Sequence, residues 1–107
     1  MENKIEHITV KAKLYLKKPE EGGRTTGIGS GYRPNHVFRK PTIMKDIHAY
    51  IGEIRFDGQE LILPGETKIV TVKFLRTPAV EQFIKVGQKW FIYEVPRLVA
   101  EGEIVEV

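Results

Sequence analysis

Hydrophobic and polar side chains alternate along the first part of the chain. In residues 8–17 every second side chain is apolar, and those between them are lysine, threonine or tyrosine. A period of two is the pattern of a β-strand that buries one face. Residues 19–35, PEEGGRTTGIGSGYRPN, contain five glycines and two prolines, so they predict a long, shaped loop with no regular helix.

Shorter apolar runs predict the next strands. Strand character returns at 37–38, and residues 47–56 are rich in β-branched and aromatic side chains. An Asp-Gly pair follows at 57–58 and favours the left-handed conformations of a tight hairpin turn. We therefore expect residues 61–63 to pair back on the preceding strand.

The second half of the chain has the same kind of pattern. A Pro-Gly pair at 64–65 fits a type II turn, and residues 70–75 alternate as a strand would. Further strands are predicted at 88–93 and 98–107, with Gly102 as a candidate for a β-bulge.

Only residues 79–86 offer a candidate helix, because no longer stretch keeps a period of 3.6 residues. Six or so short strands separated by turn signals predict an all-β sandwich or closed barrel, and closure removes exposed strand edges. A length of 107 residues fits one domain, 1–107. We find no internal repeat or linker in the sequence.

Charge is unevenly distributed along the chain. The net charge is +3, yet residues 1–40 hold nine Lys and Arg against four Glu, whereas residues 94–107 hold one Arg against four Glu. The basic half permits an anionic partner, although charged strand faces in contact with solvent explain the pattern equally well. Cysteine is absent, no apolar run approaches the ~20 residues that cross a membrane, and the start lacks a secretory signal, so a cytoplasmic protein is expected.

Catalytic side chains are scarce. Ser30 is the one serine and lies in GIGSGY, which loosely resembles a nucleophile elbow. Such an elbow needs a strand-to-helix turn, which an all-β chain does not offer, so Ser30 is interpreted as part of a structural turn. His7, His36 and His48 are too far apart in sequence for a typical metal motif, and each is interpreted as a surface or hydrogen-bonded histidine. The glycine-rich loop matches no nucleotide-binding motif. We expect no enzyme activity, no cofactor and no metal.

Because catalytic groups are scarce, binding of a partner through arginine side chains is the main remaining function. Guanidinium groups form bidentate contacts with phosphates and carboxylates, and aromatic residues precede two of these arginines. Recognition of a partner and a structural role, in which the arginines satisfy loop carbonyls beside core aromatics, are equally compatible with the sequence. The four arginines are Arg24, Arg33, Arg39 and Arg76.

Two blocks of sequence resemble a known family. Residues 17–39, KKPEEGGRTTGIGSGYRPNHVFR, and residues 61–82, LILPGETKIVTVKFLRTPAVEQ, resemble in the same order the C-terminal barrel of translation elongation factor Tu. The resemblance implies a closed six-stranded antiparallel β-barrel. In that factor the barrel packs against the GTPase domain and helps hold the T stem of aminoacyl-tRNA along its phosphate backbone.

The resemblance also implies a candidate RNA-binding site. The matching positions are Arg24, Thr25 where the family has histidine, Asn35 where it has glutamine, and Arg76 where it has lysine. We add Arg33 from the same loop as a further RNA-binding candidate.

Other segments depart from the family pattern. The family's GGRTVGAG is replaced by VPRLVAEG at 95–102. The segment 40–63 is longer than the corresponding segment of the family, and the added length gives new surface that includes His48 and Tyr50. Together with Met1, the rewritten C-terminal segment indicates a diverged, stand-alone protein.

Two functional hypotheses follow. The first is a non-catalytic binding module of the translation apparatus that contacts tRNA or another structured RNA through its backbone. The second is a protein-interaction domain that binds or imitates partners of elongation factor Tu, such as another translation factor, without binding RNA. Neither hypothesis involves a membrane or a nucleotide cofactor.

Overall fold

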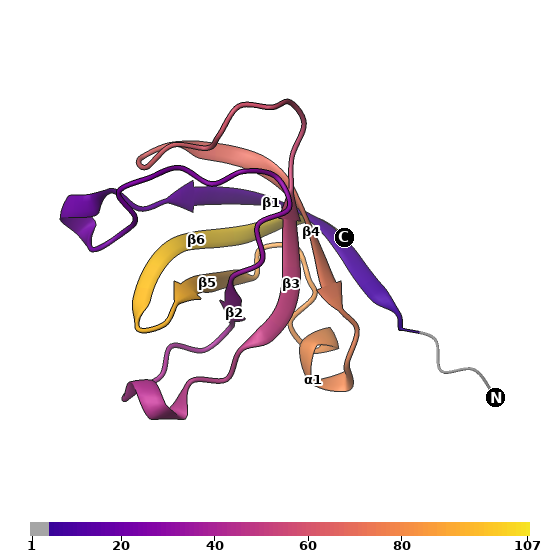
Figure 1. The fold of residues 1–107 in the computed structure, drawn as a ribbon. Coiled ribbons are helices and arrows are strands. Elements are labelled where there is room, and N and C mark those ends of the chain that lie inside the picture. Colours follow the sequence, from indigo (N-terminus) through magenta and orange to yellow (C-terminus); the bar gives the residue numbers. More distant parts are fainter. Residues whose placement is uncertain (1–4) are drawn as a thin grey trace.

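Six antiparallel strands close into a barrel in this computed structural model, which describes residues 5–107 (Figure 1). The order around the barrel is β1-β4-β3-β2-β5-β6, and β6 pairs with β1 to complete the closure. This arrangement confirms the all-β closed barrel that the resemblance implied. Met1, on which the stand-alone hypothesis partly rested, lies outside the described residues. The elements are β1 (His7–Leu16), η1 (Pro19–Glu21), β2 (Asn35–Val37), η2 (Met44–Asp46), β3 (Tyr50–Arg55), β4 (Thr67–Leu75), α1 (Pro78–Glu81), β5 (Lys89–Glu94) and β6 (Arg97–Glu106).

Alternation in β1 and β4 produces the inside and outside of the barrel. Val10, Ala12 and Leu14 are buried, whereas Lys11 and Lys13 between them are exposed. β4 repeats this pattern, and its buried residues stand opposite those of β1 in the antiparallel register. The sheet therefore has an apolar interior and a charged exterior, as the period of two predicted.

The centre of the barrel is aromatic and contains one histidine. Trp90 is fully buried and donates its Nε1 proton to Nδ1 of His36 over 3.1 Å. Phe74 packs edge-on against both rings, with centroid distances of 5.1 Å to His36 and 5.8 Å to Trp90. Gly102 lies against the same indole, and a Cβ there would stand 2.7 Å from the Trp90 ring.

The predicted bulge at Gly102 is therefore wrong. Gly102 pairs regularly with Leu14 on one side and Trp90 on the other, and the register shifts occur at Lys11/Ala12 and Ile92/Tyr93. Glycine is needed at this position because the indole approaches the backbone too closely for any side chain.

The prediction that residues 61–63 pair back on β3 is also wrong. β3 pairs with β2 and β4, and Ile62 instead forms a bridge with Ile28 of the glycine-rich loop. Ile28 and Ile62 are 2% and 1% exposed, so this bridge buries two apolar side chains and satisfies backbone groups of both loops.

The predicted helix and the predicted start of β3 differ most from the structure, while the other strand ends shift by at most three residues. The helix expected at 79–86 is only α1, where Thr77 accepts a hydrogen bond from the amide of Val80 at the N-cap. Phe83 then stacks on Phe38, with centroids 4.6 Å apart and rings 3° from parallel. The strand expected from residue 47 begins at Tyr50. No helix within residues 5–107 has the length and apolar character to span a membrane.

Candidate functional site

Two arginines meet one carboxylate on the outer face of β3. The side chain of Glu53, in the middle of β3, is only 11% exposed. Arg33, in the loop before β2, donates from Nε to Oε2 of Glu53 at 2.9 Å, and its Nη2 lies 2.8 Å from the same oxygen as an ion pair. Arg55 lies two residues along the strand, on the same face, and donates from Nε to Oε1. Each carboxylate oxygen therefore accepts from a different guanidinium.

The outer sides of both guanidiniums face solvent. The side chains of Arg33 and Arg55 are 74% and 63% exposed, and each guanidinium has N–H donors that Glu53 does not use. Lys73 on β4 stands directly across from Glu53. We call Arg33, Glu53, Arg55 and Lys73 the β3 cluster. Three cations against one carboxylate give this cluster excess positive charge.

The hydrogen bonds of the β3 cluster keep it ionised. The hydrogen bond from Arg55 and then that from Arg33 hold the pKa of Glu53 below its ordinary value, and they outweigh burial, which acts in the opposite direction. The hydrogen bond to Glu53 raises the pKa of Arg55. The carboxylate therefore orients both guanidiniums without neutralising the site.

The surface beside the cluster is hollowed on two sides. Arg33, Arg55 and Lys73 line a hollow of about 180 Å³, and Arg33 also lines one of about 210 Å³ with Asn35. Both hollows contain Ile51, which is exposed on β3. The structure thus brings together two of the predicted RNA-binding residues, Arg33 and Asn35.

Arg24 is held differently from Arg33. Its Nη1 pairs with Oε2 of Glu94, its Nε and Nη2 donate to O and Oγ1 of Thr26 at 3.2 and 3.0 Å, and Nη2 reaches O of Gly27 at 3.3 Å. The guanidinium carbon lies 5.5 Å from the ring centroid of Tyr32, whose hydroxyl donates to Glu94. Burial first, and then the hydrogen bond to Glu94, raise the pKa of Tyr32. Arg24 therefore organises the glycine-rich loop.

Thr25, Asn35 and Arg76 each have surroundings of their own. Thr25 is exposed in the glycine-rich loop, and Asn35 opens β2 and donates from Nδ2 to O of Tyr93 at 3.3 Å. Arg76 follows β4 and pairs with Glu6 at 3.5 Å and Glu81 at 3.0 Å. Arg76 thus makes its contacts near α1, away from the ion pairs of the β3 cluster.

Sequence reasoning missed Glu53 and Arg55. Their spacing of two on a predicted strand placed them on one face, which was the available signal. Arg33 lies twenty positions before Glu53 in the sequence. Its contact with Glu53 depends on the closed topology, which brings the loop before β2 beside β3.

The catalytic candidates have structural surroundings. Oγ of Ser30 accepts from the amide of Phe56 at 2.9 Å, which fixes a turn. Burial lowers the pKa of His36 to about 4, so this ring is neutral at physiological pH. Within residues 5–107, no group of three or more His, Cys, Asp and Glu side chains is placed to hold a metal ion.

Taken together, the fold and the site define an all-β closed barrel whose outer face carries a cluster of oriented charged side chains. Comparison with known families gives the closer assignment. The family model described as the elongation factor Tu C-terminal domain matches residues 4–107. The chain belongs to this family of non-catalytic β-barrel domains, which confirms the resemblance seen in its sequence.

Proposed function

We propose that this protein is a non-catalytic binding module of the translation apparatus that contacts the sugar-phosphate backbone of tRNA or another structured RNA. The observation that carries the proposal is the β3 cluster, in which one buried carboxylate holds two exposed guanidiniums side by side. Arginine forks fit phosphate oxygens, and contacts of this kind recognise the shape of an RNA duplex without reading bases.

Each candidate residue has a distinct role in this proposal. Arg33 and Arg55 donate to phosphates, and Lys73 adds a third positive charge. Asn35 lies exposed beside Arg33, and Thr25 lies exposed in the glycine-rich loop; both donate neutral hydrogen bonds to the RNA backbone. Arg24 shapes the loop that carries Thr25, and Arg76 contributes long-range attraction from the end of β4.

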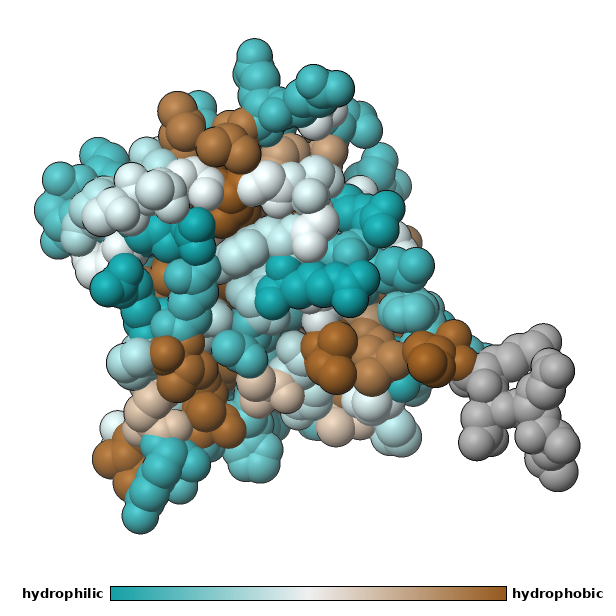
Figure 2. Space-filling model, in the orientation of Figure 1, coloured by the Kyte–Doolittle hydropathy of each residue, from teal (hydrophilic) through white to brown (hydrophobic). Residues whose placement is uncertain are grey.

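The character of the surface supports a polar partner. On the face shown in Figure 2, hydrophobic side chains form separate groups, and hydrophilic side chains lie between them. Standard protein interfaces have an apolar core surrounded by a polar rim, whereas nucleic-acid interfaces are more polar and more positively charged.

Binding to another protein, without RNA, is the second candidate function. It is favoured by the fact that Arg24 and Arg76 are already paired with carboxylates of the same chain. The exposed Val95, where the family consensus has glycine, also places a side chain in the turn between β5 and β6.

A titration that compares two double variants separates these functions. Fluorescence anisotropy of labelled bulk aminoacyl-tRNA and of a labelled RNA duplex is followed as the protein is added at low salt. We expect saturable binding, and we expect Arg33→Ala/Arg55→Ala to weaken it at least about tenfold, because two charge-assisted contacts are lost.

Lys13→Ala/Lys89→Ala is the matched control, since it removes the same charge from β1 and β5. The control should retain most of the affinity. Equal losses in the two double variants would show only general charge attraction. Absence of binding in the parent protein would leave a protein partner as the function.

A further inference from the structure

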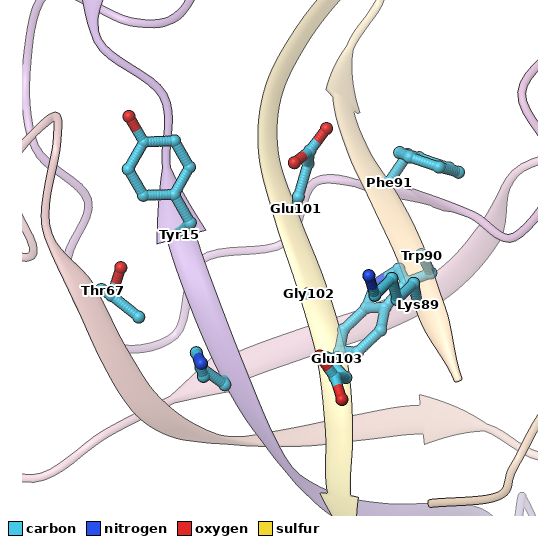
Figure 3. Close-up of a pocket in the computed structure, with 9 residues that line it drawn as sticks. Tyr15, Thr67, Lys89, Trp90, Phe91, Glu101, Gly102 and Glu103 are labelled. Carbon is cyan, nitrogen blue, oxygen red and sulfur yellow. The ribbon is translucent and has the colours of Figure 1, made fainter. Parts of the chain in front are cut away.

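Another hollow lies on the opposite side of the barrel from the β3 cluster. It has a volume of about 340 Å³ and opens over β6, between β1 and β5 (Figure 3). In the closed order of strands, β6 is three strands from β3 in either direction. The hollow is therefore separate from the surface proposed to contact RNA.

One carboxylate in this hollow stands between two aromatic side chains. Glu101 on β6 is paired across the sheet with Tyr15 of β1 on one side and with Phe91 of β5 on the other. Cross-strand neighbours have Cβ atoms about 5 Å apart, so the three side chains form one row. Figure 3 shows Glu101 between the two rings.

Other contacts hold the two aromatic walls in place. The Tyr15 hydroxyl donates to Oε1 of Glu21, which also accepts from the amide of Lys18. On the other wall, Nζ of Lys40 lies 4.8 Å from the ring centroid of Phe91. The row of Tyr15, Glu101 and Phe91 is thus built before any partner arrives.

The floor of the hollow is the backbone of β6, which lies over the packed core. Gly102 follows Glu101 and faces inward, where the Trp90 indole lies against it. The open space lies on the outer side of β6, between the side chains of β1 and β5.

The charges of the hollow divide into two rows. Glu103, in the neighbouring row, has Lys13 and Lys89 as its cross-strand neighbours. Glu101 has aromatic neighbours instead, and none of the ion pairs formed within residues 5–107 includes it. A half-buried carboxylate between two aromatic side chains attracts a cation through its charge, and aromatic rings can add to that attraction.

We infer that this hollow binds an arginine side chain of a partner polypeptide, with the guanidinium on Glu101 and between Tyr15 and Phe91. Arginine fits better than lysine because its planar group pairs with a carboxylate through two N–H donors and also stacks on aromatic rings. The inference goes beyond the proposed function, since it assigns a polypeptide-binding site to a face that the RNA does not need.

Peptide titration followed by NMR tests this site. The ¹⁵N-labelled full chain is titrated with a blocked pentapeptide that has one central arginine, and in parallel with the same peptide carrying uncharged citrulline. We expect saturable shifts of the Gly102 amide and Trp90 indole signals with a dissociation constant on the order of 1 mM for the arginine peptide. Citrulline should weaken binding about tenfold or more.

Two conservative variants locate the contact. Glu101→Gln should lose the arginine preference, whereas Glu103→Gln, the matched control in the lysine row, should keep it. A well-dispersed spectrum of each variant verifies folding. Equal binding of both peptides, retention of binding in Glu101→Gln, or no saturable shift at ~20 mM peptide, well above the expected constant, would each overturn the inference. The inference would also be overturned if spermine, a polycation without a guanidinium group, shifted these signals at concentrations at which the arginine peptide does not.

Discussion

At the scale of single residues, the barrel depends on how His36, Trp90 and Gly102 fit together in its centre. His36 accepts a hydrogen bond from Trp90 and is fully buried, so only its neutral form suits the core. Gly102 lets the indole lie against β6. These three residues connect β2, β5 and β6 through the core of the barrel.

His36 makes the stability of the fold depend on pH. Its folded pKa of about 4 lies below the ordinary 6.5, so the unfolded chain binds a proton that the folded chain excludes. The contribution of His36 to the free energy of unfolding is therefore fully present above pH 6.5. It decreases by about 3 kcal/mol as the pH falls from 6.5 towards 4. Urea denaturation at several pH values measures this slope.

His36→Gln is the control for that slope, because an amide oxygen still accepts from the Trp90 indole but does not titrate in this range. We expect the variant to be less stable at pH 7.5 and to have a shallower slope between pH 6.5 and 4. An unchanged slope would assign the pH dependence to other groups.

Gly102→Ala tests the close approach of the indole. A Cβ only 2.7 Å from the Trp90 ring forces the ring or the strand to move, and we expect a loss of roughly 1–3 kcal/mol of unfolding free energy. At Gly29 the nearest atom to a new Cβ is 3.6 Å away, so Gly29→Ala should change stability little. Similar effects of the two changes in denaturant titrations would contradict the packing described for Gly102.

At the scale of elements, the glycine-rich loop is held by particular side chains. Arg24 pairs with Glu94 at the end of β5 and binds the loop's own oxygens, while Ile28 bridges to Ile62. The loop therefore has a fixed shape, although its sequence contains five glycines. Its far end delivers Arg33 to Glu53 on β3.

Arg24 and Arg76 are predicted to differ in their effect on stability. The Arg24 and Glu94 side chains are 23% and 35% exposed, so Arg24→Ala leaves a half-buried carboxylate without its cation, with only the Tyr32 hydroxyl donating to it, and should cost about 1–3 kcal/mol. The pair of Arg76 with Glu81 is more exposed, at 44% and 46%, and Arg76→Ala should cost less than about 1 kcal/mol. Thermal or urea unfolding of the two variants compares them. Equal costs would show that Arg24 has no special role in the loop.

The sequence predicted the secondary-structure elements better than the contacts between them. The alternation in β1 and β4 was sufficient to predict both strands, and the glycine content to predict the loop. The Ile28–Ile62 bridge was not predictable, because it joins two loops through the topology of the whole barrel. For the same reason the sequence indicated Arg33 as a binding residue but not the carboxylate that orients it.

At the scale of the whole molecule, the closed barrel presents two distinct chemical faces. The β3 cluster offers oriented guanidiniums, and the hollow over β6 offers a carboxylate between aromatic rings. Because the two sites lie on opposite strands of one rigid scaffold, an RNA and a polypeptide would not compete for the same surface. The two proposals together therefore predict that RNA and an arginine peptide bind at the same time.

The salt dependence of RNA binding tests the central claim most directly. Affinity for a labelled RNA duplex is measured across a range of salt concentrations for the parent protein and for Arg33→Ala/Arg55→Ala. If both arginines contact phosphates, the slope of log affinity against log salt should become shallower by about 1.5 in the double variant, since each lost contact removes ~0.7–0.9. The same slope in both proteins, or no saturable binding by the parent, would contradict RNA-backbone contact at the β3 cluster.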